Sequence, residues 1–170
     1  MSIEAEHCAV GPGGPHLRVE VLSQPRYLAG LRELVLTISR RLGFGESAAG
    51  HIALAIDEAL ANVIRHGYEG QTDRPIFLAV SPIEENGQPA GIRICIEDHA
   101  RQVDPSKIKS RDLEAVRPGG LGVHIIREIM DEVTYEPRSE KGMRVVMSKR
   151  ITPGAAEGSG APAPGGKSAS

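Results

Sequence analysis

The stretch at residues 55–68 reads AIDEALANVIRHGY. Its apolar residues recur every three or four positions, a spacing that places side chains on one face of an α-helix. Glu58, Asn62 and His66 follow one another at intervals of four, so they form a polar row along one edge of that face. Such a row either faces solvent, the commoner case for a random polar triplet, or points into whatever the helix covers.

Outward from this stretch, hydrophobic periodicity and turn residues predict the remaining elements. We expect strands at 16–22, 75–83, 91–97, 132–137 and 142–151, and helices at 25–43, 46–66 and 121–130. Turn-forming Glu85, Asn86 and Gly87 join the second and third strands as a hairpin. This order predicts an α+β fold, a two-layer sandwich with helices on one face of a mixed or mostly antiparallel sheet.

Composition confines the folded part to one domain. A chain of 170 residues with 40% hydrophobic residues has room for one core and needs no metal or disulfide to fold. Gly and Pro are concentrated near the ends, and the segment after Ile151 is almost entirely Gly, Ala, Pro and Ser. We therefore expect a flexible leader at 1–15, a folded domain at 16–151 and a disordered tail at 152–170.

Charge and hydropathy exclude several classes of protein. Twenty basic residues against 22 acidic ones give a net charge of −2, which does not favour direct binding to nucleic acid. No apolar run approaches the roughly 20 residues that span a bilayer, and the N-terminus lacks a signal-peptide core. Cys8 and Cys95 are the only cysteines, too few for a disulfide framework. We expect a cytoplasmic protein without membrane contact.

An aspartate interrupts the apolar pattern of the third expected strand. Ile92, Ile94 and Ile96 occupy one face of that strand, and Asp98 continues the same parity where the strand ends. A carboxylate on the core side requires a hydrogen-bond donor, and the amino group of a ligand is one candidate. The other interpretation is that Asp98 caps the following turn.

A glycine-rich entry precedes the last expected helix. Residues 118–122 read PGGLG, which places unpaired backbone donors and a positive helix end where an anion can bind. The segment is not a Walker loop, because no Gly-Lys-Ser/Thr follows, and it does not come after the first strand as a Rossmann fingerprint does. Many helices begin with such glycines, so this element alone is weak evidence.

Taken in order, three segments resemble the motifs of the GHKL ATPase and kinase superfamily, especially its anti-sigma-factor serine kinases. AIDEALANVIRHGY at 55–68 is similar to the N-box, and DHARQVDP at 98–105 is similar to the first glycine box. GGLGVHIIR at 119–127, followed by DEV at 131–133, resembles the second glycine box and the strand after it. The resemblance covers residues 17–151.

The resemblance implies a Bergerat, histidine-kinase-like ATPase fold that binds ATP and magnesium. In that family pattern, Asn62 coordinates Mg²⁺, Asp98 accepts the adenine amino group, and the segment from Asp104 to Gly120 forms a flexible lid. Glu58 occupies the catalytic position, which activates the attacking hydroxyl. The implied nucleotide-binding residues are Asn62, Asp98, Ala100, Gly119, Gly120, Leu121 and Gly122.

The chain departs from the family pattern in its first glycine box. Ala100 stands where the family has Gly, and Gln102 and Val103 replace a small residue and an aromatic. Alanine adds a methyl beside the nucleotide and restricts positive φ, so we expect ATP binding to be weakened but retained. Arg101 either approaches a phosphate or pairs with a nearby acid.

The resemblance implies an anti-sigma factor that is also a serine/threonine-protein kinase. Its partners would be a sigma factor and a STAS-domain anti-sigma antagonist, which it phosphorylates, and it would act as a homodimer. The alternative is a non-catalytic or weakly catalytic ATP-dependent binding module. The catalytic domain of a histidine kinase is disfavoured, because the chain has no long helix pair carrying a phosphoacceptor histidine.

Overall fold

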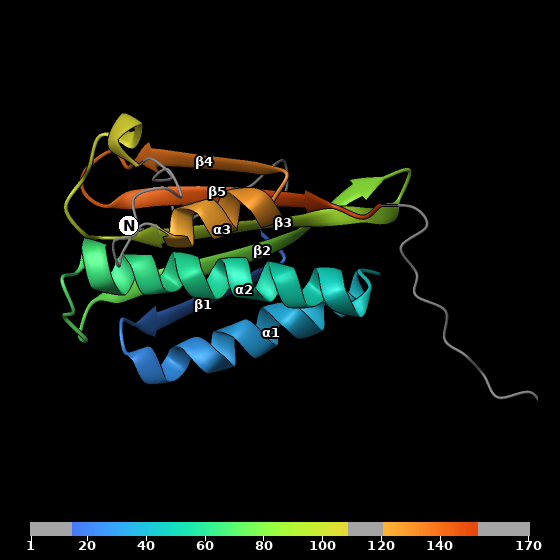
Figure 1. Cartoon of the computed structure of the whole chain (residues 1–170), viewed down its shortest axis with the longest axis horizontal. Helices are drawn as coiled ribbons and strands as arrows, with labels where there is room; N and C mark the ends of the chain where they lie inside the picture. Colours follow the sequence, from blue (N-terminus) through green and yellow to red (C-terminus); the bar gives the residue numbers. More distant parts are fainter. Residues whose placement is uncertain (1–14, 109–120, 153–170) are drawn as a thin grey trace, which may run out of the picture.

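The computed structural model describes residues 15–108 and 121–152 (Figure 1). Its strands are β1 (Leu17–Leu22), β2 (Pro75–Glu85), β3 (Gln88–Asp98), β4 (Glu132–Pro137) and β5 (Met143–Arg150). Its α-helices are α1 (Leu28–Arg41), α2 (Glu46–Asn62) and α3 (Leu121–Ile129). Short 3-10 turns occupy Pro25–Tyr27 and Pro105–Lys107, and a π-helical turn occupies Val63–Gly67. Almost all of the expected leader and tail, and the expected lid from residue 109 onward, lie outside the described residues.

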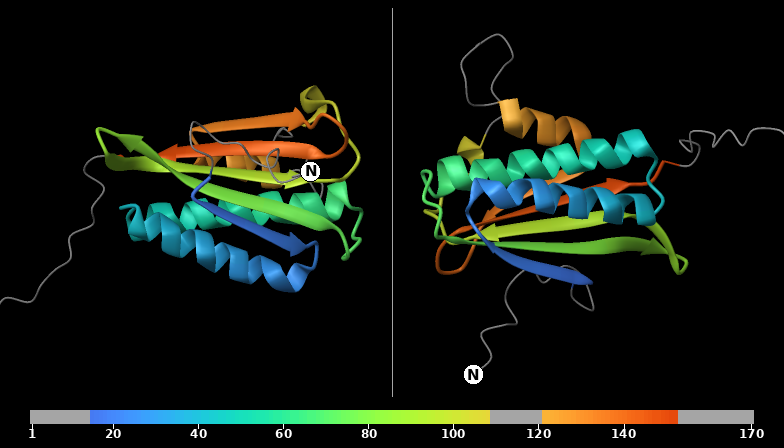
Figure 2. Two further views of the ribbon diagram at one scale, coloured as in Figure 1. Left: turned by 180° about the vertical axis from the view of Figure 1, so that it is seen from behind. Right: turned by 90° about the horizontal axis from the view of Figure 1, so that it is seen from below.

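The five strands form one sheet in the order β1-β2-β3-β5-β4. Every neighbouring pair in this sheet is antiparallel. The three helices lie together on one side of the sheet, as the two views of Figure 2 show. The predicted α+β sandwich is therefore confirmed, and its sheet is wholly antiparallel among the strands described.

The hairpin between β2 and β3 closes through two residues with positive φ. Asn86 has φ 53° and Gly87 has φ 73°, and Glu85 pairs with Gln88 across the turn. Asn-Gly is the sequence that this kind of tight turn favours, because both residues tolerate the left-handed region. Pairing continues to the turn itself, so both strands are longer than the periodicity predicted.

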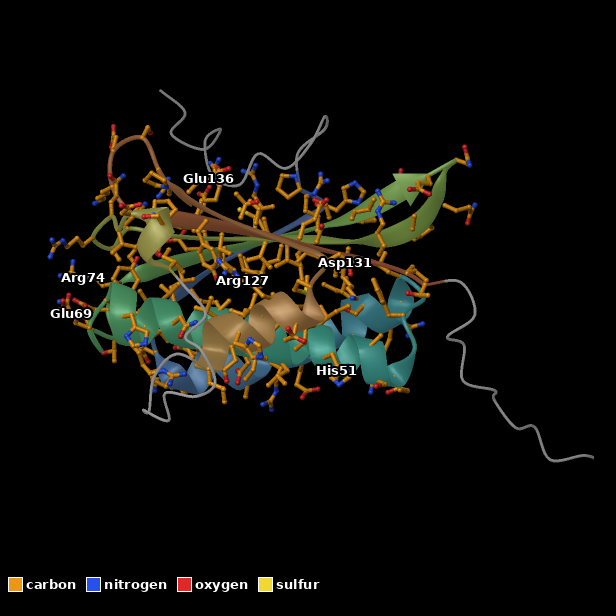
Figure 3. The ribbon with its side chains drawn as sticks, turned by 45° about the horizontal axis from the view of Figure 1, so that its top comes forward. His51, Glu69, Arg74, Arg127, Asp131 and Glu136 are labelled. Carbon is orange, nitrogen blue, oxygen red and sulfur yellow. The ribbon has the colours of Figure 1, made fainter. Side chains whose placement is uncertain are left out.

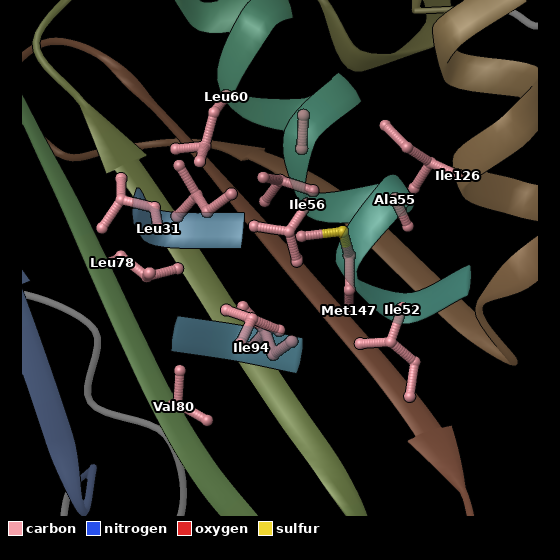
Figure 4. Close-up of a cluster of buried hydrophobic side chains, with 14 of the residues drawn as sticks. Leu31, Ile52, Ala55, Ile56, Leu60, Leu78, Val80, Ile94, Ile126 and Met147 are labelled. Carbon is pink, nitrogen blue, oxygen red and sulfur yellow. The ribbon is translucent and has the colours of Figure 1, made fainter. Parts of the chain in front are cut away.

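The core lies between α2 and the middle of the sheet. Ile52, Ile56 and Leu60 on α2 are fully buried, and they meet Ile94 and Met147 of the central strands (Figure 4). Helices α1 and α3 pack on either side of α2 and close the layer. Truncating one of these isoleucines to alanine would cost about 2–5 kcal/mol. The side chains of α2 thus fix the helix over the sheet, and its C-terminal end with it.

The end of α2 differs from the expectation of one α-helix running to His66. The α-helical part ends at Asn62, and a π-helical turn follows, in which the Tyr68 N–H donates to the Val63 carbonyl at 2.8 Å. The chain then leaves the helix through Glu69, with φ 51°. A π turn widens the helix by one residue, and such turns are frequent at functional sites.

Polar and charged side chains lie on the surface at both ends of the molecule. Glu69 and Arg74 lie at one end of the molecule, and His51 lies towards the other end (Figure 3). All three are exposed. None of the helices within residues 15–108 and 121–152 is long and apolar enough to cross a membrane.

Candidate functional site

A cavity of about 370 Å³ opens between the C-terminal end of α2 and the sheet. Its walls come from α2, the π-helical turn, β3, β4, β5, the segment after β3 and the first turn of α3. Its lining residues include Asn62, Gly67, Asp98, Ala100, Gly122, Tyr135, Met143 and Val145. A volume of this size with a few polar groups in an apolar lining is typical of a small-molecule site.

Asp98 is the buried polar group of this cavity, with only 5% of the residue exposed. Its Oδ1 accepts hydrogen bonds from the backbone N–H groups of Ala100, at 2.8 Å, and Met143, at 3.1 Å. No described residue donates a hydrogen bond to Oδ2, the oxygen nearer Gly67. Burial raises the pKa of this carboxyl above its ordinary value, although the two backbone donors and the Arg138 guanidinium oppose the shift. One carboxylate oxygen is therefore available for a donor from outside the chain.

An ionic cluster on the opposite face of the sheet holds the backbone at Asp98. Glu97 is fully buried, and its carboxylate pairs with Arg144, Nε to Oε1 at 2.5 Å, and with Arg138, Nε to Oε2 at 3.5 Å. Arg138 also donates from Nη1 to the Asp98 carbonyl at 3.0 Å. Gln102 donates its side-chain N–H to the Arg138 carbonyl. The cluster thus ties β3, the β4–β5 turn and the segment after β3 together.

Gly142 lets the β4–β5 turn approach β3. Its φ is +88°, and a Cβ atom at this position would lie 1.9 Å from the Asp98 carbonyl oxygen. No side chain fits there, and the left-handed backbone is one that L-residues rarely adopt. This close approach brings the Met143 N–H within hydrogen-bonding distance of Asp98.

Tyr68 joins the end of β3 to the start of β2. Its hydroxyl donates to the Pro75 carbonyl at 2.5 Å and accepts from the His99 N–H at 2.7 Å. Burial raises the pKa of Tyr68 to about 12, so the phenol stays neutral and can donate at all physiological pH values. Because Tyr68 follows the π-helical turn directly, the same side chain also positions that turn.

Ala100 fits the cavity wall because Gly67 faces it. A Cβ atom at Gly67 would lie 3.1 Å from the Ala100 Cβ, closer than two methyl groups normally approach. Among the described residues, only Glu69 and Asn86 combine a side chain with a positive φ, so the backbone at Ala100 does not require glycine. The alanine therefore introduces no backbone strain, and its methyl occupies space left by Gly67.

The start of α3 touches α2 at two of the predicted residues. A Cβ atom at Gly122 would lie 2.7 Å from Glu58 Oε2 and 3.2 Å from Asn62 Nδ2. Asn62 and Gly122 both line the cavity, whereas Glu58 stands beside it and pairs with Arg65, Nη2 to Oε2 at 3.8 Å. The backbone of α3 is thus brought against a carboxylate and an amide at the cavity edge.

The structure brings together most of the residues predicted for the site. Asn62, Asp98, Ala100 and Gly122 line one cavity, and Glu58 lies next to Gly122. Leu121 begins α3 with 59% of the residue exposed and is not a lining residue. Two further predicted residues, Gly119 and Gly120, lie outside the described residues.

Sequence reasoning missed the residues that support Asp98. Gly142 carried a usable signal, because a glycine between two strands often marks a left-handed turn. Arg138 and Met143 carried none, since they reach Asp98 across 40 and 45 residues of chain. Tyr135 on β4 also lines the cavity, and the sequence predicted only that it belongs to a strand at 132–137.

Comparison with known proteins agrees with this fold. The family described as the histidine kinase-like ATPase domain matches residues 21–149, which contain every described residue of the cavity. In the solved structure of the RsbU and RsbW domains of Rv1364c from Mycobacterium tuberculosis, the similar part has a TM-score of 0.51 and 16% identity. That match covers 81% of this chain and only 33% of the solved chain, so it supports the fold alone.

Curated relatives add a similarity in sequence. The serine-protein kinase RsbW of Listeria monocytogenes is 27% identical over 139 residues, covering 79% of this chain and 87% of the relative. The serine-protein kinase RsbW of Oceanobacillus iheyensis is 26% identical over 144 residues, covering 80% of this chain and 87% of the relative. Both alignments extend over most of each protein.

Replacing Gly142 with alanine tests the close approach of the β4–β5 turn. We expect Gly142→Ala to lower the free energy of unfolding by roughly 2–5 kcal/mol, because backbone strain and a clash with Asp98 add. Gly70→Ala is the matched control, since Gly70 has φ +81° but its Cβ would meet nothing within 4 Å. Urea unfolding of both variants measures the difference, and equal losses would contradict the clash.

The raised pKa of Asp98 predicts a pH-dependent effect on stability. The folded protein holds the Asp98 proton more tightly than the unfolded chain, so wild-type stability falls as pH rises from about 3.9 through the raised folded pKa. Asp98→Asn retains an Oδ1 acceptor for both backbone donors and carries no charge. We therefore expect the variant to melt at an equal or higher temperature than wild type at pH 7.5.

The difference in melting temperature should shrink as the pH approaches the ordinary aspartate value. Glu140→Gln is the control, since it removes an exposed carboxylate from the β4–β5 turn. A variant that melts well below wild type at pH 7.5 would show that the charged form of Asp98 stabilises the unliganded fold.

Proposed function

The chain belongs to the histidine kinase-like ATPase domain family, and from this premise we propose that it binds Mg-ATP in the cavity beneath α2 and acts as a serine/threonine-protein kinase. The observation that supports this best is the distribution of polar groups along the cavity. A buried acceptor, Asp98, lies at the end of β3, and an amide, a carboxylate and a helix start lie together at the α2–α3 contact.

Asp98 is suited to hold an adenine base. Its free Oδ2 can accept a hydrogen bond from the exocyclic amino group, while Ala100 and Met143 keep Oδ1 in place. Ile96 and Val145 supply apolar surface for the purine ring. A hydrogen bond to a buried carboxylate is worth more than one between neutral groups, which gives the site its preference for an amino-purine.

The contact between α2 and α3 is suited to phosphates and magnesium. Gly122 lets the first turn of α3 come close to Asn62, and the unpaired N–H groups of a helix start attract anions. The Asn62 side-chain oxygen is of the type that Mg²⁺ prefers, and it lines the cavity. When bound, the magnesium ion would neutralise charge on the phosphates.

Glu58 is proposed to orient the hydroxyl group that is phosphorylated. An ordinary glutamate is a weak base toward a serine hydroxyl, so positioning contributes more than basicity and the proton is accepted late. Its carboxylate lies beside Gly122, adjacent to the proposed phosphate end. On its exposed side this carboxylate pairs with Arg65 at 3.8 Å.

The partners we propose follow from the resemblance to anti-sigma-factor serine kinases. Such a protein would bind a sigma factor and phosphorylate a STAS-domain antagonist, and it would do so as a homodimer. The matched relatives from Listeria and Oceanobacillus carry the name serine-protein kinase, which agrees with the proposed reaction.

A non-catalytic ATP-dependent binding module is the alternative, and Ala100 was the sequence feature that favoured it. Ala100 has an ordinary backbone conformation, and its methyl packs against Gly67. Backbone strain at Ala100 therefore gives no argument against nucleotide binding, although its methyl still lines the cavity. We retain the kinase as the proposal, and the phosphotransfer assay below separates the two functions.

Asp98→Asn tests the adenine assignment. The variant presents an N–H where the purine amino group needs an acceptor, so we expect its affinity for Mg-ATP to fall by at least about 100-fold. Isothermal titration calorimetry measures the loss, and circular dichroism checks that the fold is retained. Glu140→Gln should bind like wild type, and unchanged affinity in Asp98→Asn would remove the assignment.

Glu58→Gln tests the kinase proposal. Wild type is incubated with Mg-ATP and the STAS-domain proteins of its source organism, and phosphoserine and phosphothreonine are identified by mass spectrometry. We expect Glu58→Gln to bind ATP within about 3-fold of wild type and to lose at least about 100-fold in transfer rate. If wild type binds ATP yet phosphorylates none of these proteins, the binding module is the better description.

A further inference from the structure

Three hydroxyl groups in the described part of the chain are buried without a hydrogen-bond partner: those of Ser39, Ser81 and Tyr135. Ser39 lies on α1 and Ser81 on β2, and neither lines the cavity described above. Tyr135 does line it. A buried hydroxyl without a partner costs free energy, so one carried by a lining residue of a binding cavity suggests a partner that arrives with the ligand and reaches a hydroxyl that is covered while the cavity is empty.

The sheet register places Tyr135 in the floor of the cavity. Tyr135 pairs with Val145, and Val145 pairs with Ile96 on its other side, so the three residues form one row across β4, β5 and β3. All three line the cavity. Met143 donates its N–H to Asp98 Oδ1 and lies two residues before Val145 on β5, so the two side chains share one face of the strand. The phenol ring therefore continues the apolar floor that begins beside Asp98.

The apolar surroundings of the ring do not account for the hydroxyl, because phenylalanine would pack equally well there. Burial raises the pKa of Tyr135, opposed by the Arg127 guanidinium, so the group stays a neutral donor at physiological pH. Arg127 belongs to α3, lies between that helix and the strands (Figure 3), and donates to the Ile108 carbonyl at 3.2 Å. The guanidinium that opposes the shift in the pKa of Tyr135 thus already donates to a backbone carbonyl.

We propose that the Tyr135 hydroxyl hydrogen-bonds the nucleoside part of the bound nucleotide and is a specificity-determining residue of the site. This inference rests on the proposed binding of ATP. The phosphates are assigned to the α2–α3 contact at Asn62 and Gly122, whereas Tyr135 comes from the sheet and stands among Val145, Met143 and Ile108. An uncharged base or sugar suits those neighbours, and a ring nitrogen or a ribose oxygen supplies the acceptor.

Tyr135→Phe tests the proposal, with Ser39→Ala as the matched control that removes a buried unpartnered hydroxyl away from the cavity. Isothermal titration calorimetry of the full chain with Mg-ATP and Mg-ADP gives the affinities, and thermal unfolding gives the stability without nucleotide. We expect Tyr135→Phe to weaken both nucleotides about 3- to 10-fold, as the loss of one hydrogen bond would. Ser39→Ala should bind both nucleotides like wild type.

The melting temperature separates a ligand contact from a structural role. Removing an unpartnered hydroxyl should leave the unliganded protein as stable as wild type or more stable, while nucleotide affinity falls. Unchanged affinity, or a loss of affinity accompanied by a lower melting temperature, would overturn the proposal. Weaker binding of ATP alone would place the effect at the γ-phosphate and also overturn it. Failure of wild type to bind ATP would instead refute the proposed function itself.

Discussion

Asp98 places an ionisable group where β3 ends against the core, and a charge in that position persists only if hydrogen-bond donors surround it. The donors come from two distant parts of the chain, the segment after β3 and the start of β5. Arg138 and the buried Glu97 stabilise the backbone from the other face of the sheet. Hydrogen bonding to Oδ1 requires β5, the glycine in its turn and the chain after β3 to lie where they do. The same arrangement leaves Oδ2 without a donor from the described residues.

The second feature that shapes the cavity is the way α2 ends above this carboxylate. The α-helix gives way to a π-helical turn at Val63, and Tyr68 then anchors the chain to both β2 and β3. The resulting path puts Gly67 against Ala100 and leaves Asn62 facing the cavity. Helix α3 completes the enclosure through Gly122, whose missing side chain allows contact with Glu58 and Asn62. The two ends of the cavity therefore depend on different backbone features.

Much of the fold could be predicted from local patterns. Period-two and period-3.6 hydrophobicity located each strand and α-helix within the described residues, and Asn86-Gly87 identified the central hairpin, because these signals depend on neighbouring residues. The parity of Asp98 placed its side chain on the core side for the same reason. The π-helical turn could not be predicted, since it depends on Tyr68 finding partners at Pro75 and His99. Gly142 has a local signal for the turn but none for its approach to Asp98, and the contacts of Arg138 and Tyr135 are set by tertiary packing and have no local signature.

The pairing of Gly67 with Ala100 has a consequence for how related sequences can vary. The cavity wall holds one methyl group at this point, since a second Cβ would lie 3.1 Å from the first. Ala100 is thus compatible with glycine at position 67, and a side chain at 67 would be tolerated more easily with glycine at 100. Positions 67 and 100, 33 residues apart in the chain, are therefore energetically coupled. The effect of a substitution at one of them on stability depends on which residue occupies the other.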